Sequence, residues 1–281
     1  MRSVAMKPRI AVLGSGTARP ELPPHFFERE DAEPWAAPVR LSAFARTPYE
    51  RLVVDVGYVD AAQKAASLAD VIFINSFADY GIDAMRAVLA IPVVGAGEAA
   101  LLEAARQAEH FAIVTVWPDS MAFLYHERLR ALGLAERCVS IVHVSPESEL
   151  ARLGSDDSVM ERMHRHEPTV LEQLRDACSR AVARQGAGCV VLGCTCMAPI
   201  GPALAAACAF PVLESSRVGL AASITAAGTR QDRRTPRSDG TQLVTLVDAW
   251  AGAQATNSIA REPDCPVCDQ GAANDTTVRS P

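Results

Sequence analysis

The stretches that decide the fold are Asp70-Val-Ile-Phe-Ile-Asn-Ser76 and Gly188-Cys-Val-Val-Leu-Gly-Cys194. Each contains a short, nearly continuous apolar run, which is typical of a strand covered by helices on both faces of its sheet. A helical pattern and a second short apolar run follow each one. Pro92 lies 16 positions after Ser76, and Pro211 lies 17 positions after Cys194. This spacing suggests two similar βαβ units, although spacing alone leaves a chance likeness between ordinary α/β units equally open.

The same alternation of short β-branched runs and longer amphipathic stretches continues along the chain. It predicts an α/β fold of two pseudo-symmetric lobes, each with a mainly parallel sheet flanked by helices. The predicted strands are 9–13, 39–44, 71–74, 93–95, 111–116, 139–144, 189–192 and 212–213. The predicted helices are 59–69, 81–89, 98–108, 120–132, 170–185, 199–208 and 216–227.

The composition changes at Thr229, after which Arg, Asp, Thr, Gly, Asn and Pro dominate. We therefore predict one α/β domain over residues 1–228, with two interleaved lobes, and a flexible tail over residues 229–281. Leu243–Trp250 is the one apolar patch of this tail, and it could dock on the domain as a strand or a helix. The Pro-rich segment Ala18–Pro38 is interpreted as a lid or a subunit contact.

Charge and composition limit the partners. The 281 residues carry a formal net charge of −6, with 49% hydrophobic and 21% charged residues, as in a soluble globular protein. This charge gives no reason to expect nucleic acid or an anionic membrane as partner. Pro92 and several glycines and glutamates interrupt the longest apolar region, so no membrane span is expected. Since no export signal is visible, the 8 scattered cysteines are interpreted as reduced thiols of a cytoplasmic protein.

Cys194 has the position of a catalytic group. It follows a predicted strand, and ligands of open α/β sheets bind outside the carboxyl ends of the strands. A thiol that faces the start of a helix has its pKa lowered from about 8.5 toward neutrality, so it can act as base, acid or nucleophile. The alternative is a small buried apolar residue, which we expect for Cys178, Cys189 and Cys208. The glycine-flanked turn favours a functional role for Cys194.

Three further cysteines are assigned other roles. Cys196 is either a second thiol of the pocket or a core residue beneath the following helix, and we expect the core. Cys265-Pro-Val-Cys268 is a single C-x-x-C in the predicted tail. A zinc site needs about four ligands, so we predict a solvated tail here and no metal site in the chain.

Six segments, in this order, resemble the aspartate/glutamate/hydantoin racemase superfamily, and within it the hydantoin (allantoin) racemase branch. They lie within most of residues 9–227. The segments are Ile74-Asn-Ser-Phe-Ala-Asp-Tyr-Gly-Ile-Asp-Ala84, Ile91-Pro-Val-Val-Gly-Ala-Gly-Glu-Ala-Ala100, Phe111-Ala-Ile-Val-Thr-Val116, Leu132-Gly-Leu-Ala-Glu-Arg-Cys-Val-Ser140, Val191-Leu-Gly-Cys-Thr-Cys-Met197 and Phe210-Pro-Val-Leu-Glu-Ser215.

The resemblance implies an active site between two facing lobes, with a cysteine on each side of a small-molecule substrate and no metal or cofactor. One cysteine removes the α-proton and the other delivers a proton to the opposite face. Cys194 matches the second cysteine, but Ser76 stands at the position of the first. A serine hydroxyl is a far weaker acid than a thiol and needs a neighbouring base. Proton delivery to a single face is therefore easier for this chain than symmetric racemisation.

The resemblance also implies substrate contacts, all at the carboxyl ends of predicted strands. The loop after the first strand contains Ser15 and Thr17, whose hydroxyls and backbone N–H groups could hold a carboxylate or an imide carbonyl. Thr115 and Thr195 could donate to a developing enolate, although a threonine there can equally bond its own backbone. The predicted substrate-binding residues are Ser15, Thr17, Asn75, Phe77, Thr115 and Thr195.

Three functions remain open. The first is a racemase or isomerase of a hydantoin-like ring or an amino-acid-like acid, which the overall resemblance favours. The second is a single-cysteine lyase or hydrolase on the same scaffold, acting by decarboxylation or on the ring of a thiohydantoin-like substrate. The third is a non-catalytic small-molecule binding protein, against which the retained Gly193-Cys194-Thr195 turn counts. The sequence leaves a homo-oligomer open.

Overall fold

The structure is a computed structural model that describes residues 7–14, 22–228 and 238–255. The chain divides into two compact units, each built from separate stretches. Unit 1 comprises Met1–Ile72, Tyr80–Pro92 and Arg230–Pro281, and unit 2 comprises Phe73–Asp79 and Val93–Thr229. Both strand-end turns, which carry Ser76 and Cys194, belong to unit 2.

The strands form two four-stranded sheets with the same topology. The first has the order β2-β1-β3-β4 and the second the order β6-β5-β7-β8, which repeats the first with every number raised by four. This confirms the two predicted lobes with parallel sheets. The strands are β1 (Arg9–Leu13), β2 (Glu33–Ala37), β3 (Val71–Ile74), β4 (Val93–Gly95), β5 (Phe111–Thr115), β6 (Cys138–His143), β7 (Cys189–Leu192) and β8 (Val212–Glu214).

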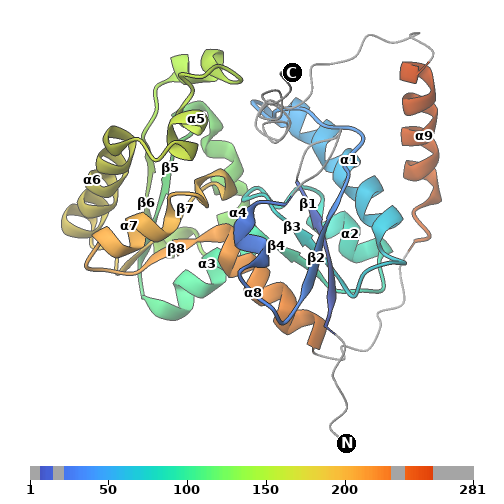
Figure 1. Cartoon of the computed structure of the whole chain (residues 1–281), viewed down its shortest axis with the longest axis horizontal. Helices are drawn as coiled ribbons and strands as arrows, with labels where there is room; N and C mark the ends of the chain where they lie inside the picture. The colour runs from blue at the N-terminus through green and yellow to red at the C-terminus, as the bar shows by residue number, and fades with distance from the viewer. Residues whose placement is uncertain (1–6, 15–21, 229–237, 256–281) are drawn as a thin grey trace, which may run out of the picture. The chain divides into compact units, whose positions relative to one another are not determined.

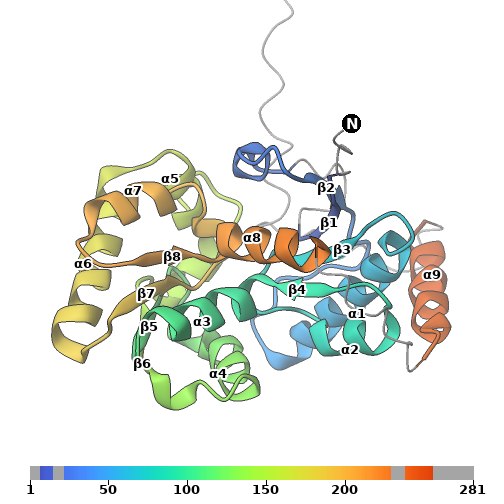
Figure 2. The ribbon, with the colours of Figure 1, turned by 90° about the horizontal axis from the view of Figure 1, so that it is seen from below.

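The second sheet is covered on both faces. β5 is parallel to β6 and β7, and β7 is parallel to β8. Figure 2 shows α6 (Pro168–Gln185) and α7 (Gly201–Ala207) on one side of this sheet and α3 (Ala96–Gln107) and α4 (Ala122–Ala131) on the other. Every residue of β5 and β7 is consequently buried, which explains why both strands are apolar except for Thr115 at the end of β5.

Unit 1 is built around α1 (Pro48–Ala65), with α2 (Ile82–Val88) and α9 (Thr241–Ala255) beside it (Figure 1). Thr47 and Glu50 form a capping box that satisfies N–H groups at the start of α1. The remaining elements are α5 (Val159–His164), α8 (Ser215–Gly228) and the 3₁₀ helices η1 (Pro24–Phe27), η2 (Asp119–Met121), η3 (Ala135–Arg137), η4 (Glu147–Arg152) and η5 (Thr195–Met197).

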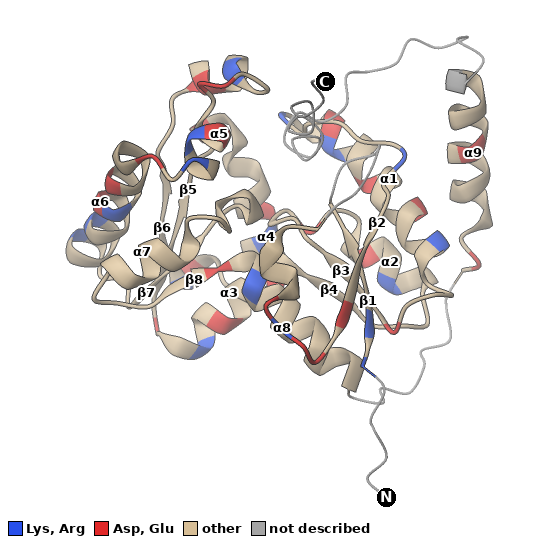
Figure 3. Ribbon diagram, in the orientation of Figure 1, with Lys and Arg blue, Asp and Glu red and all other residues tan. Residues whose placement is uncertain are grey.

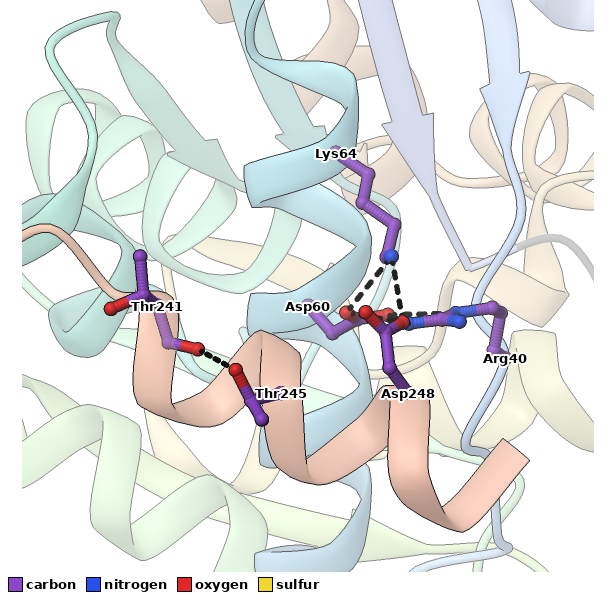
Figure 4. A network of polar contacts seen from close by, with 6 residues as sticks. All are labelled: Arg40, Asp60, Lys64, Thr241, Thr245 and Asp248. Carbon is purple, nitrogen blue, oxygen red and sulfur yellow. Dashed lines mark hydrogen bonds and ion pairs between the residues drawn. The ribbon is translucent and has the colours of Figure 1, made fainter. Parts of the chain in front are cut away.

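An ion-pair network attaches α9 to α1 and the segment before it (Figure 4). Asp60 is fully buried and accepts hydrogen bonds from Arg40 Nε at 3.1 Å and Nη2 at 2.9 Å. Asp248 of α9 lies 2.8 Å from Arg40 Nη2 and 3.1 Å from Lys64 Nζ. Val247 of α9 is buried as well. The patch Leu243–Trp250 thus docks as a helix, whereas residues 229–237 and 256–281 of the predicted tail lie outside the described residues.

The predictions of two elements were wrong. The strand expected at 39–44 lies instead at Glu33–Ala37, within the proline-rich segment. β2 is an edge strand, where the missing N–H of Pro34 removes no hydrogen bond of the sheet interior. α1 begins at Pro48 rather than Val59, because the capping box starts the helix eleven residues earlier.

Acidic and basic residues are interspersed along the described helices and are not gathered by sign (Figure 3). None of the helices in the described ranges combines the length and apolar character needed to cross a bilayer.

Candidate functional site

The turn after β7 holds Cys194 in an extended conformation, with φ −148° and ψ 136°. Its sulfur accepts a hydrogen bond from Cys196 N at 3.1 Å and so caps η5. The first helical element after Cys194 is this three-residue 3₁₀ helix, and the α-helix expected at 199–208 follows as α7 from Gly201. The positive group that faces the sulfur is therefore one backbone N–H rather than the end of a long helix.

A disulfide joins Cys194 to Cys196. This corrects two expectations, because the pair is not reduced in the structure and Cys196 is half-buried rather than a core residue. A serine or an apolar residue at position 196 could not make this bond. While the disulfide persists, the Cys194 sulfur carries no exchangeable proton, so acid/base chemistry at this position requires prior reduction.

The turn after β3 holds Ser76, and Asp79 fastens it to α3. Asp79 N donates to Ser76 O at 3.1 Å, and the Asp79 carboxylate accepts from Gly97 N at 2.9 Å and Glu98 N at 2.7 Å. A Cβ at Gly95 would collide with this carboxylate. Asp79 is fully buried, and burial raises its pKa to about 7. The nearby guanidinium of Arg128, with Nε 3.2 Å from Asp79 Oδ2, opposes this rise.

The two turns contact each other. Thr195, which follows Cys194, donates its hydroxyl proton to the main-chain oxygen of Asn75 at 3.0 Å. Ser216 of α8 donates to Asn75 Oδ1 at 2.8 Å. Ser76 is next to Asn75 in the chain, so the structure brings together the two turns that sequence analysis singled out. Direct opposition of the Ser76 and Cys194 side chains across a cleft stays a prediction.

The other predicted substrate contacts have different surroundings. Thr115 is fully buried and its Oγ1 lies 2.6 Å from the Tyr125 hydroxyl. Phe77 is buried and its ring centroid lies 5.3 Å from that of Tyr125. A direct contact of either residue with substrate stays a prediction, and it would require this packing to rearrange. Ser15 and Thr17 lie outside the described residues.

Sequence analysis missed Tyr125 and Arg128 on α4, and it gave no role to Asp79. Tyr125 donates a hydrogen bond to Gly193 O at 3.0 Å, across 68 positions of sequence. Burial raises the pKa of Tyr125, so its hydroxyl keeps its proton. Asp79 accepts from Gly97 N and Glu98 N, which lie 18 and 19 positions further along the chain, so no local sequence signal marked its role.

The remaining described thiols are poor acids. Cys178 and Cys189 are fully buried, as predicted, whereas Cys208 is half-buried. Burial raises the pKa of Cys178 to about 12 and that of Cys138 to about 11, and it also raises the pKa of Cys189 and Cys208. Neutral thiols of this kind are weak nucleophiles at pH 7.

Within the described ranges, no group of three or more His, Cys, Asp or Glu side chains is arranged to hold a metal ion. Cys265 and Cys268 lie outside the described residues.

Several known proteins are similar to this chain in sequence or in fold. A hydantoin racemase from Paenarthrobacter aurescens is 34% identical over 145 residues, which are 52% of this chain and 56% of that protein. The alignment spans about half the length of the curated relatives that the chain matches. The solved allantoin racemase from Klebsiella pneumoniae superimposes with a TM-score of 0.64 at 20% identity, over 84% of this chain and 98% of that one.

A solved arylmalonate decarboxylase superimposes with a TM-score of 0.54 at 20% identity, over 82% of this chain and 97% of that one. At such identities the structural matches establish the fold alone. The sequence profile described as "Asp/Glu/Hydantoin racemase" matches residues 24–222, well over half of the chain. Together with the repeated sheet topology and the paired turns, this match establishes that the chain belongs to the Asp/Glu/hydantoin racemase family.

Proposed function

We propose that the chain is a cofactor-independent racemase or isomerase. Its substrate would be a hydantoin-like ring or an amino-acid-like acid, and the reaction moves a proton at the carbon alpha to a carbonyl. The observation that carries the proposal is the Thr195–Asn75 hydrogen bond, which joins the turns of Cys194 and Ser76. The similarity to a hydantoin racemase favours the cyclic substrate.

In the proposed reaction, reduced Cys194 acts as the principal acid and base. Its thiolate removes the α-proton, and the electron pair of the C–H bond becomes the enolate. The Cys194 thiol returns a proton to the same face, and inversion requires that water protonates the opposite face. The Cys196 N–H donates to the Cys194 sulfur in the disulfide-bonded structure, and the same contact after reduction would stabilise the thiolate. Ser76 hydrogen-bonds the substrate or its enolate, because a hydroxyl without an adjacent base is too weak an acid to match a thiol.

A single-cysteine lyase or hydrolase is the second candidate, and the serine at position 76 favours it. In a decarboxylation, the C–C bond to the carboxylate breaks and CO₂ leaves with its two oxygens. The bonding electrons form an enolate, and Cys194 protonates this enolate on one face. This decarboxylation needs only one thiol, in contrast to the reaction of the racemases that use two.

Incubation of the reduced protein with hydantoins, thiohydantoins, amino acids and malonic acids in D₂O tests these functions. Optical rotation, deuterium at the α-carbon and product mass separate racemisation, one-face exchange and bond cleavage. We expect deuterium to replace the α-proton with no cleavage of the substrate. A chelator should not change the rate of this exchange. Release of CO₂ or sulfide would establish the second candidate. Ligand binding with no exchange and no cleavage would establish a binding protein.

A further inference from the structure

We propose that Tyr125 is a positioning residue that sets the orientation of Cys194 through the peptide bond before it. The inference rests on the proposed role of Cys194, but it concerns a different element, since Tyr125 lies on α4. Nothing in the position of Tyr125 along the sequence distinguishes it from an ordinary core residue of an amphipathic helix. Its contacts in the folded chain do.

The first step is the direction of the hydrogen bonds around Tyr125. Gly193 O lies 3.0 Å from the Tyr125 hydroxyl and, as a carbonyl oxygen, can only accept. The single proton of Tyr125 is therefore used on Gly193, and the 2.6 Å contact with Thr115 must have Thr115 as donor. Thr115 Oγ1 in turn accepts from Trp117 N at 3.2 Å. The result is a buried, directed chain from Thr115 through Tyr125 to Gly193.

The second step is the rigidity of the Gly193–Cys194 peptide. No described peptide bond is cis, so the Cys194 N–H points opposite to the Gly193 carbonyl within one plane. By holding the carbonyl, Tyr125 fixes this plane and with it the direction in which the Cys194 Cα and side chain leave the strand. Gly193 N also donates to Val114 O at 2.8 Å, so both ends of this residue are held by hydrogen bonds.

The third step is the close fit of Tyr125 against both turns. A Cβ on Gly193 would lie 3.0 Å from Tyr125 Cε1 and 2.8 Å from Ile113 Cγ2, so the turn passes directly over the ring. On the other turn, Phe77 follows Ser76 and packs on the same ring at an interplanar angle of 56°. Tyr125 therefore contacts the residue before Cys194 and the residue after Ser76.

Removal of the hydroxyl alone separates positioning from packing. In Tyr125→Phe the ring remains, but the Gly193 carbonyl loses its donor in a buried site and the peptide plane becomes free to rotate. The contact between Cys194 Sγ and Cys196 N–H then loosens, so the thiolate loses stabilisation. The net value of one hydrogen bond, about 0.5–1.5 kcal/mol, corresponds to a shift of roughly half to one pH unit or a two- to tenfold rate change.

The experiment uses the full-length, reduced protein and compares wild type with Tyr125→Phe. Tyr58→Phe makes the same change in a buried tyrosine of α1 and is the matched control. The first measurement is the pH dependence of iodoacetamide alkylation at Cys194, followed by mass spectrometry of its peptide. The second is kcat and KM for α-deuterium exchange, and the third is the urea midpoint, which reports stability.

We expect Tyr125→Phe to raise the midpoint pH of Cys194 alkylation by about half to one unit and to lower kcat about two- to tenfold, with KM within twofold. Tyr58→Phe should change only the urea midpoint. The proposal is overturned if Tyr125→Phe keeps the wild-type alkylation profile and the wild-type kcat. It is also overturned if Tyr125→Phe and Tyr58→Phe lose kcat equally. If wild type exchanges no α-proton, the proposed function fails, and the alkylation profile alone then decides whether Tyr125 positions Cys194.

Discussion

Cys194 and Ser76 occupy equivalent turns of the two sheets, and their different acidities set different expectations for substitution. Cys194→Ser should lower the rate of α-deuterium exchange by about 10²–10⁴-fold, the usual effect of removing a general acid/base. Ser76→Ala removes one neutral hydrogen bond and should cost roughly tenfold. Ser76→Cys should add exchange from the second enantiomer. The measurement is deuterium uptake from each enantiomer of the substrate.

Two results would contradict this assignment. Wild-type turnover in Cys194→Ser would remove Cys194 from the mechanism. Equal exchange of both enantiomers by wild type, with only one direction abolished in Ser76→Ala, would make Ser76 a true second base.

If Cys194 is the acid and base of the proposed reaction, the Cys194–Cys196 disulfide makes activity dependent on reduction. A dithiol such as dithiothreitol reduces the pair to two thiols and is itself oxidised to a disulfide. Protein prepared without reductant should be inactive and should recover activity when dithiothreitol is added. In Cys196→Ser the disulfide cannot form, so activity should be the same with and without dithiothreitol. Mass spectrometry of the Cys194 peptide reports whether the disulfide is present. Full activity of wild type in the disulfide form would refute the requirement for reduction.

At the scale of an element, Asp79 links the Ser76 turn to α3 and makes this link sensitive to pH. Its pKa is about 7 in the folded protein, against an ordinary value of 3.8. Between these values the folded state retains a proton that the unfolded state has lost. The free energy of unfolding therefore falls as pH rises from 4 to 7, by at most about 1.4 kcal/mol per pH unit from this group.

Asp79→Asn removes this titration while it preserves the size of the side chain. The variant should show a shallower decline of its urea midpoint between pH 4 and pH 7 than wild type. Unfolding curves at each pH unit provide the comparison. Identical slopes for the two proteins would mean that Asp79 is ionised throughout the range.

The docking of α9 offers a second prediction at this scale. Arg40→Met leaves the fully buried Asp60 with Lys64, 3.9 Å away, as its counter-charge among the described residues. Loss of one partner of a buried pair typically destabilises by about 3–5 kcal/mol, and a urea titration would detect this. Asp248→Asn should change the midpoint little, because the Asp248 side chain is half exposed and screened by water. An equal loss in both variants would contradict the central role of Asp60.

At the scale of the whole molecule, the sequence predicted the sheets better than the site. β3 and β7 have the predicted bounds because strands buried on both faces need unbroken apolar runs. β2 escaped prediction because Pro34 is tolerated only at an edge, and edges cannot be identified from one segment. The turns that carry Ser76 and Cys194 were predicted correctly, because each residue comes shortly after the end of a predicted strand.

Other parts of the site depend on contacts between distant segments. Tyr125 and Gly193 are 68 positions apart, and Asp79 accepts from backbone groups 18 and 19 positions away. No local pattern encodes such pairs. The Cys194–Cys196 disulfide was not predicted for another reason, because a chain without a visible export signal is expected to keep its cysteines reduced.

The order in which the stretches of the two units follow one another along the chain has a consequence for protein synthesis. Unit 1 takes its three stretches from the start, the middle and the end of the sequence, whereas unit 2 is complete at Thr229. A nascent polypeptide therefore releases all of unit 2 from the ribosome before α9 emerges to cover its part of α1. Until then the part of α1 that α9 contacts lacks its final cover, so slow synthesis of the residues after Thr229 would prolong the exposure of this surface to chaperones and proteases.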